Sequence, residues 1–313
     1  MSKNTSTTDE NYRFYNTSCL DMSECEDNSV ALTVTSPPYW NAIDYDTHTK
    51  DREAWYRERE YDGLGVTYHD WLQTLKKVFI EVYRVTVDGG FCAIVIGTIL
   101  HKGKHYPAPF DLTSMLSKTD WHFHQDIIWN KVTGGVRRAG SFIQHPHPGY
   151  FYPNIMTEYI LVFRKGKKPR YGKCNSVPLD NVFTRDIANN IWHIAPVPPK
   201  TIDHPCPFPD ELVRRLVLLY SQEGDTILDP FLGSGQTARG ALQNNRKCVG
   251  YEIEPQYIAL ACQRLYDPPR RKHQLLPKVE KHPVERKAIN YEFRDGEELF
   301  LPLEGQSERW GKS

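Results

Sequence analysis

The chain has 313 residues, and its 39 basic and 39 acidic side chains leave no formal net charge, so any surface for a polyanion must be a local patch. Hydrophobic residues make up 39% and charged residues 25%, which is typical of a globular protein; neither a signal peptide nor a bilayer-spanning segment is evident. The seven cysteines form no CxxC pair, which argues against a disulfide framework or a zinc site and favours a reducing, cytoplasmic location.

The first half of the chain predicts alternating strands and helices. A strand over 30–34 ends at Pro37 and Pro38, because proline donates no backbone hydrogen bond and fixes φ. The charged stretch 41–65 is expected to form a mobile surface loop. The next elements are predicted from apolar spacing and are a helix over 68–84, a strand over 91–96, a helix over 109–116 and a strand over 125–129.

The second half continues this alternation after an irregular stretch. A strand is predicted over 157–164, and little regular structure is expected from there to residue 199. Then follow a helix over 210–220, a strand over 225–229, a turn over 230–235, a helix over 237–244, a strand over 248–252 and a helix over 256–264. This order predicts an α/β fold with a largely parallel sheet. The polar tail over 267–313 is expected to be partly disordered or to lie along the surface.

A nucleotide-type binding site is indicated by residues 226–237, which read TILDPFLGSGQT. A buried strand leads into a turn with two glycines, and a helix starts at once, so backbone N–H groups are open to a ligand. Glu252 ends the next strand, where an acid can accept ribose hydroxyls. Ala238 occupies the third position of a G-x-G-x-x-G pattern and no Gly-Lys-Ser/Thr follows, which argues against a dinucleotide fold and a phosphate loop.

The string 229–235, DPFLGSG, closely resembles the cofactor motif of S-adenosylmethionine-dependent DNA amino-methyltransferases. The resemblance implies S-adenosyl-L-methionine as the cofactor and a Rossmann-like methyltransferase sheet. The segment HPCPFP over 204–209 resembles the family segment that borders the methionine moiety of the cofactor. The residues assigned to cofactor binding are Asp229, Pro230, Phe231, Gly233, Ser234, Gly235, Thr237, Glu252, Asp21 and Phe208.

The motif Ser36-Pro37-Pro38-Tyr39 predicts the catalytic site. An exocyclic amine on a nucleobase is a poor nucleophile, because its lone pair is delocalised into the ring. The Ser36 side chain and the Pro37 carbonyl can accept its two hydrogens, and the rigid turn holds both acceptors before reaction. Tyr39 offers a flat face on which an extruded base can stack.

The order of the two motifs, catalytic first and cofactor last, is that of the permuted beta class of amino-methyltransferases in restriction-modification systems. The resemblance covers about residues 12 to 266 and predicts a DNA-recognition region between the two halves. The expected organisation is a catalytic half over 1–131, a target-recognition region over 132–195 that includes a core strand near 157–164, and a cofactor-binding half over 196–266.

Two positions depart from the family pattern. Members of the family often have an acid in a D-C-L run that contacts the cofactor adenine; here the run is Ser18-Cys19-Leu20, and Asp21 follows as a candidate substitute. After the strand over 91–96 the family has Gly-Asp, whereas this chain has Gly97-Thr98.

Double-stranded DNA is the expected partner, with residues 132–195 and the loop 41–65 facing it. The run 164–173 carries six Lys or Arg and no acid, and such a run can neutralise phosphates. Any one of these side chains is alternatively part of a solvated charged face. The candidate contacts are Arg137, Arg138, Lys165, Lys167, Lys168 and Arg170.

The SPPY form of the catalytic motif is most common in cytosine-N4 enzymes, which predicts N4 of cytosine as the methylated atom. Adenine N6 stays open as an alternative, since the DPPY form of that class differs only in the first residue. A protein glutamine methyltransferase or an inactive DNA-binding subunit is a more distant alternative. A separately acting restriction endonuclease is a possible partner, and no metal is expected, because His145 and His147 have no third ligand nearby.

Overall fold

The computed structural model describes residues 6–40, 67–101, 104–131, 155–168, 170, 187–197, 202 and 207–267. All of them belong to the first of the two units of the chain, Met1–Leu275. The loop 41–65, most of the expected target-recognition region and the tail from residue 268 lie outside the described residues.

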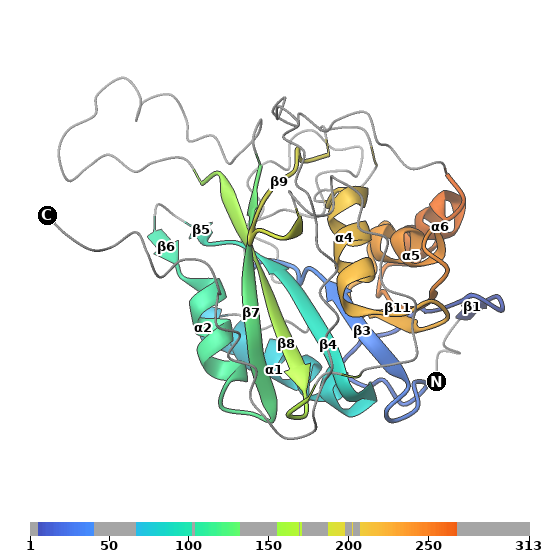
Figure 1. Ribbon diagram of the computed structural model, residues 1–313, viewed down its shortest axis with the longest axis horizontal. Helices are drawn as coiled ribbons and strands as arrows, with labels where there is room; N and C mark the ends of the chain where they lie inside the picture. The colour runs from blue at the N-terminus through green and yellow to red at the C-terminus, as the bar shows by residue number, and fades with distance from the viewer. Residues whose placement is uncertain are drawn as a thin grey trace, which may run out of the picture. The chain divides into compact units, whose positions relative to one another are not determined.

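A nine-stranded mixed sheet forms the centre of this unit, in the order β1-β2-β11-β10-β3-β4-β8-β7-β9 (Figure 1). The strands in that order are Ser6–Thr8, Tyr12–Tyr15, Lys247–Tyr251, Thr226–Asp229, Val30–Thr35, Thr86–Ile96, Thr157–Lys165, Trp121–Asn130 and Ile191–His193. Five of the eight pairings within this sheet are parallel, so the expected α/β fold with a largely parallel sheet is confirmed. The exceptions are the β1–β2 pair and β8, which runs antiparallel to both β4 and β7.

Helices cover both faces of the sheet, and the alternation of side chains along the strands shows why. In β4, Ala93 and Val95 join a buried cluster with α4 (Asp210–Tyr220), α5 (Gln236–Leu242) and α6 (Pro255–Arg264). Their neighbours Cys92 and Ile94 point the other way and join a cluster with α1 (Tyr68–Val85) and α2 (Ala108–Leu116). A fully buried Val or Ile, such as Val95 or Ile94, contributes roughly 1.5–3 kcal/mol, so both faces hold their helices firmly.

Most predicted elements are found with small shifts at their ends. The helix over 210–220 has the predicted bounds, and α1 extends one residue past its prediction to Val85. Strand β4 begins at Thr86, five residues early, because the chain continues through Gly89-Gly90 with a register shift against β3. The elements that sequence patterns did not predict are short: β1, β2, β9 and the hairpin of β5 (Ile99–His101) and β6 (Lys104–Tyr106).

Strand direction divides the sheet into two edges with different contents. Strands β3, β4, β10 and β11 run parallel, so their C-terminal ends lie together at one edge, here named the carboxyl edge. Since β8 is antiparallel, Glu158 lies at the carboxyl edge and Lys165 at the opposite, amino edge, near the arrowhead of β8 in Figure 1. None of the helices described here is long and apolar enough to cross a membrane.

Candidate active site

The SPPY and DPFLGSG motifs meet at the carboxyl edge. Thr35 and Asp229, which join them through a hydrogen bond, are 194 positions apart in the sequence. Strands β3 and β10 are parallel neighbours, with Leu32 opposite Ile227. The Thr35 hydroxyl donates a hydrogen bond of 2.7 Å to Oδ1 of the buried Asp229. The Thr237 hydroxyl donates one of 3.0 Å to the carbonyl of Val34. The end of the strand that leads into SPPY is therefore fixed directly to the cofactor motif.

The SPPY turn is held by hydrogen bonds directly after its two predicted acceptors. The indole Nε1 of Trp71 donates to the Pro38 carbonyl at 2.9 Å, and the Gly97 N–H donates to the Tyr39 hydroxyl at 2.7 Å. Within the described ranges, no hydrogen bond engages the Ser36 hydroxyl or the Pro37 carbonyl. The turn thus presents two acceptors in a fixed frame, which is the arrangement that preorganised catalysis requires.

Next to this turn lies a cluster of aromatic rings that sequence analysis missed. The Trp40 ring lies 5.6 Å from that of Tyr68, 4.9 Å from that of His101 and 4.9 Å from that of Tyr106. Lys104 lies above the Tyr106 ring at 5.0 Å. The partners of Trp40 come from the start of α1 and the β5–β6 hairpin, and stretches this short carry no readable periodicity.

The glycine turn has the backbone geometry that its sequence predicts. Gly235 has φ 77° and precedes the first turn of α5. A Cβ atom built there would lie 2.8 Å from Cβ of Ala261, so both the backbone conformation and the space require glycine. Gly233 donates its N–H to Oε2 of Glu252 at 2.9 Å, and the Phe231 N–H donates to Asp229 at 3.1 Å. The buried Pro230 and Ser234 complete the turn.

Two carboxyl groups with raised pKa values lie at this turn. Burial raises the pKa of Asp229 to about 6, although hydrogen bonds from the Thr35 hydroxyl and the Phe231 N–H oppose the shift. Burial also raises the pKa of Glu252 to about 7, against hydrogen bonds from the backbone N–H groups of residues 233, 253 and 254. The carboxylate of Glu252 sits at the end of β11, where it can accept hydroxyl groups of a ligand.

The segment before α4 borders the same turn, and its predicted contact with the methionine moiety of the cofactor stays a prediction. Gln236, the first residue of α5, donates through Nε2 to the Phe208 carbonyl at 2.7 Å and to Asp210 at 3.1 Å. Phe208 itself is buried. The structure therefore brings Phe208 together with the glycine turn, whereas residues 203–206 of the same segment lie outside the described residues.

The loop between β2 and β3 contributes a residue that sequence reasoning did not assign to the site. Burial, together with the charges of Glu252 and Asp229, raises the pKa of the Cys19 thiol to about 12, so this residue lies near both carboxyl groups. Asp21 is exposed, and its carboxylate accepts a hydrogen bond of 3.0 Å from the Ser23 N–H. The predicted contact of Asp21 with the cofactor stays a prediction.

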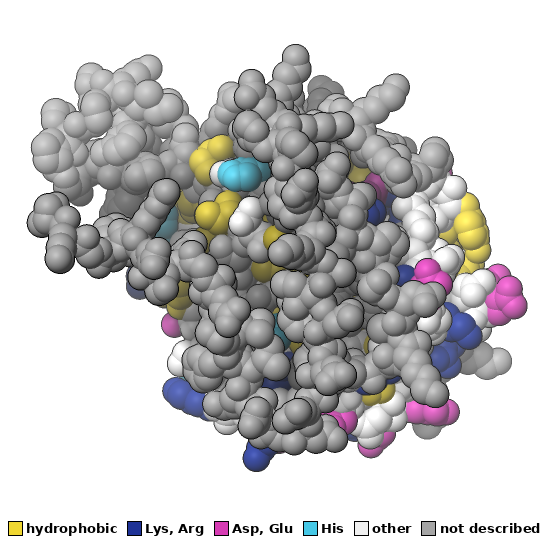
Figure 2. Space-filling view, viewed as in Figure 1, with side chains coloured by type: hydrophobic (Ala, Val, Ile, Leu, Met, Phe, Trp, Pro, Cys, Tyr) yellow, Lys and Arg dark blue, Asp and Glu magenta, His cyan; other side chains and the backbone are white. Residues whose placement is uncertain are grey.

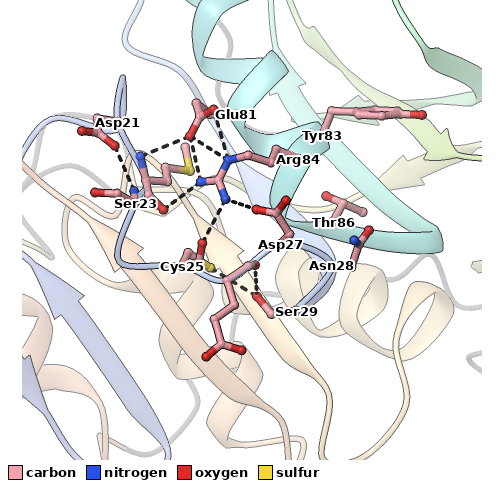
Figure 3. A network of polar contacts seen from close by, with 12 residues as sticks. Asp21, Ser23, Cys25, Asp27, Asn28, Ser29, Glu81, Tyr83, Arg84 and Thr86 are labelled. Atoms are coloured by element: carbon pink, nitrogen blue, oxygen red, sulfur yellow. Dashed lines mark hydrogen bonds and ion pairs between the residues drawn. The ribbon is translucent and has the colours of Figure 1, made fainter.

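Arg84, near the end of α1, fixes that loop at its far end (Figure 3). Its guanidinium donates to the carbonyls of Met22 at 2.9 Å and Cys25 at 3.2 Å, and it forms ion pairs with Asp27 and Glu81. Arg84 therefore ties this part of the loop to α1 through both charged and neutral acceptors.

The residues of the basic run that were predicted to contact DNA lie away from the SPPY turn. Lys165 donates to the carbonyls of Tyr83 at 2.8 Å and Thr86 at 2.7 Å and to Asn28 Oδ1 at 2.9 Å, all at the amino edge. Arg170 forms an ion pair with Asp225, at the start of β10. Lys167 and Lys168 are exposed, but they follow β8 at the same edge.

The physical reason is strand direction: β8 runs antiparallel to β4 and carries the basic run away from SPPY. Figure 2, in the view of Figure 1, shows several Lys and Arg side chains along the lower rim, at the end where β8 finishes. The structure thus does not bring Lys165, Lys167, Lys168 or Arg170 together with the SPPY turn, and their contact with DNA stays a prediction. Arg137 and Arg138 lie outside the described residues. Among the residues that are described, no three His, Cys, Asp or Glu side chains cluster as metal ligands would.

Comparison with known proteins agrees with this geometry. The sequence profile of the DNA methylase family matches residues 30–263. The chain is 32% identical over 257 residues to the Type II methyltransferase M.MjaI of Methanocaldococcus jannaschii, covering 74% of this chain and 84% of the relative. It is 29% identical to the orphan methyltransferase M.BamHII of Bacillus amyloliquefaciens, covering 76% and 89%. The chain therefore belongs to the DNA methylase family.

Solved structures show the same fold. A Thermus thermophilus protein assigned as a DNA modification methylase is 30% identical with a TM-score of 0.60, over 80% of this chain and 92% of that one. The same protein has also been solved in complex with S-adenosyl-L-methionine. The cytosine-N4-specific PvuII DNA methyltransferase is 18% identical with a TM-score of 0.63, over 83% of this chain and 88% of that one, a likeness that concerns the fold alone.

Proposed function

We propose that this protein transfers a methyl group from S-adenosyl-L-methionine to the exocyclic N4 amine of cytosine in double-stranded DNA. The observation that carries the proposal is the hydrogen bond between Thr35 and Asp229, because it joins the SPPY strand to the cofactor motif at one edge of the sheet. The SPPY form of the motif supports cytosine over adenine. The family includes enzymes for both amines, so the choice of base needs a direct test.

The proposed cofactor site consists of the glycine turn and the carboxylate of Glu252. Glu252 accepts a hydrogen bond from the Gly233 N–H and can accept ribose hydroxyls with its remaining lone pairs. The exposed Ile253, which follows Glu252 in the sequence, and the partly buried Phe231 of the glycine turn offer apolar surface for an aromatic base. These acceptors and apolar side chains fit a nucleoside-bearing sulfonium, and the complex of the Thermus thermophilus relative supports this choice.

In the proposed reaction the protein holds the acceptor amine and does not form a covalent intermediate. The Ser36 hydroxyl and the Pro37 carbonyl each accept one hydrogen of the amine, which draws the nitrogen towards tetrahedral geometry. Tyr39 stacks against the extruded base, with its hydroxyl fixed by Gly97. S-adenosylmethionine supplies a methyl group on a positively charged sulfur. As the N–C bond forms, the S–C bond breaks, and the nitrogen then releases one proton to solvent.

The DNA-facing surface that we propose lies at the carboxyl edge, around the SPPY turn. The aromatic cluster of Trp40, Tyr68, His101 and Tyr106 stands there with Lys104 beside it, and aromatic rings with a cation are suited to unstacked bases and phosphates. The predicted contacts of Arg137 and Arg138 with guanine edges remain part of the proposal. A role in protecting host DNA from a separate restriction endonuclease rests on the relatives, of which one is named a Type II enzyme and another an orphan.

One experiment separates the candidate functions. The protein is incubated with methyl-labelled S-adenosylmethionine and unmodified plasmid DNA, and the DNA is digested to nucleosides. The proposal predicts label in N4-methylcytosine, and far slower labelling with the Ser36→Ala variant. Label in N6-methyladenine would replace cytosine by adenine as the substrate. Label only in protein, or nowhere, would overturn the assignment as a DNA methyltransferase.

A further inference from the structure

A half-buried ion pair between Lys131 and Glu158 lies at the carboxyl edge, beside the SPPY turn. Lys131 follows the last residue of β7, and its N–H donates to the Met156 carbonyl at 2.9 Å, next to the pairing of Asn130 with Thr157. The two charged side chains are only 17% and 14% exposed. The Lys131 ammonium also lies 4.9 Å from the centre of the Trp129 ring. An ion pair this sheltered restrains its side chains more than a solvent-exposed pair does.

Glu158 connects this ion pair to Gly97. Strand β8 places Tyr159 opposite Ile96, so Glu158 faces the residue that follows β4. A Cβ atom built on Gly97 would lie 3.0 Å from Cγ of Glu158 and 3.2 Å from the Tyr39 hydroxyl. The Gly97 backbone is therefore enclosed by the Glu158 stem and by Tyr39.

Gly97 in turn holds Tyr39. Its N–H donates the 2.7 Å hydrogen bond to the Tyr39 hydroxyl. A shift of the Gly97 peptide would move the ring against which the target base is proposed to stack. Displacements of about 1 Å in a catalytic arrangement cost on the order of a hundredfold in rate. The contacts thus form a continuous path from Lys131 through Glu158 and Gly97 to the catalytic turn.

We propose that Lys131 and Glu158 are positioning residues that hold Tyr39 in its reactive orientation through Gly97. Neither residue touches the reacting atoms in this account. Their ion pair fixes the Glu158 stem against Gly97 and so fixes the hydroxyl end of the tyrosine. The inference rests on the proposed function, because its consequence is seen in methyl transfer to DNA.

The test uses the full chain and near-isosteric variants that remove one charge. Glu158→Gln and Lys131→Met are expected to lower the single-turnover rate of methyl transfer by about tenfold or more, while the Kd for S-adenosylmethionine changes less than about twofold. Lys131→Arg keeps the charge and is expected to retain most of the rate. Asp225→Asn, which breaks the ion pair with Arg170 at the amino edge, is the matched control and should leave the rate unchanged.

A double-mutant cycle tests whether the effect passes through Tyr39. Tyr39→Phe removes the acceptor of the Gly97 N–H, so adding Glu158→Gln to it is expected to slow the reaction by less than about twofold. Fully additive losses would overturn the proposal, as would equal rates of Lys131→Met and Lys131→Arg. If Glu158→Gln does not fold, the two Lys131 variants decide the matter alone. Absence of label in DNA with the unaltered protein would contradict the proposed function instead, so the two failures are distinguishable.

Discussion

The two edges of the sheet use polar groups in different ways. At the carboxyl edge, Asp229 and Glu252 are held by neutral donors, and their pKa values are raised by burial. At the amino edge, Arg84 and Lys165 are surrounded by backbone carbonyls and carboxylates that satisfy their charge. A carboxyl group with only neutral partners keeps lone pairs for a ligand, whereas a cation enclosed by carbonyls has little left to offer. The comparison supports the proposed binding site at the carboxyl edge and a structural role for Arg84 and Lys165 at the amino edge.

The largest effect is expected at the carboxyl edge, from Ser36→Ala. Removing one of the two proposed amine acceptors should lower the single-turnover rate by about a hundredfold or more, because the acceptor acts on the reacting nitrogen. The Kd for S-adenosylmethionine should change little, since Ser36 is outside the cofactor turn. Rapid-quench measurement with labelled cofactor gives the rate, and equilibrium binding gives the Kd. An unaltered rate would remove Ser36 from the reaction.

A second effect at the same edge depends on pH. Because the pKa of Glu252 is about 7, lowering the pH below 7 protonates the carboxyl group that is proposed to accept ribose hydroxyls. The Kd for S-adenosylmethionine is expected to rise, by up to about tenfold per pH unit. Calorimetric titration at several pH values measures this, and Glu252→Gln should bind weakly with a nearly flat profile.

Protein stability should move in the opposite direction over the same range. An acid whose pKa is raised on folding binds more protons in the folded state, so Glu252 adds stability as the pH falls from about 7 towards its ordinary value of 4.5. Weaker binding below pH 7 is then not explained by unfolding. A Kd that is constant from pH 8 to 6 would separate Glu252 from cofactor binding.

The sequence predicted the carboxyl edge better than the amino edge, and the reason is physical. DPFLGSG and SPPY are local motifs, since the turn conformation of Gly235 and the rigidity of Pro37 are properties of a few adjacent residues. Because β3 and β10 are parallel, their C-terminal ends lie at the same edge of the sheet, and this brings the two motifs together. The location of Lys165 depends instead on the antiparallel direction of β8, which apolar periodicity cannot reveal. Contacts such as Trp71 with Pro38 were likewise unpredictable, because they join side chains far apart in the sequence.

A moderate effect, on stability alone, is expected at the amino edge from Lys165→Met. The substitution leaves the carbonyls of Tyr83 and Thr86 without their donor, so the free energy of unfolding should fall by about 2 kcal/mol. Chemical denaturation measures this change. Affinity for DNA at a fixed salt concentration should be unaltered, with the exposed Lys167→Met as the control for stability. A clear loss of DNA affinity in the folded variant would show that Lys165 contributes to the DNA-binding surface.

The smallest effect is expected from reversing two exposed charges at the amino edge, Lys167→Glu with Lys168→Glu. If this edge does not face DNA, both the affinity and the dependence of log K on log salt concentration should be those of the unaltered protein. Fluorescence anisotropy over a series of salt concentrations measures both. A flatter salt dependence in the variant would show that DNA phosphates lie near these lysines and that both edges of the sheet contact the DNA.

The most direct measurement is a structure of the protein with S-adenosylhomocysteine and an unmethylated DNA duplex that contains the sequence it recognises. The account predicts the nucleoside at the Gly233–Gly235 turn and an extruded base against Tyr39, with its exocyclic nitrogen within hydrogen-bond distance of Ser36 Oγ and the Pro37 carbonyl oxygen. A base bound elsewhere, or a cofactor away from the glycine turn, would contradict it.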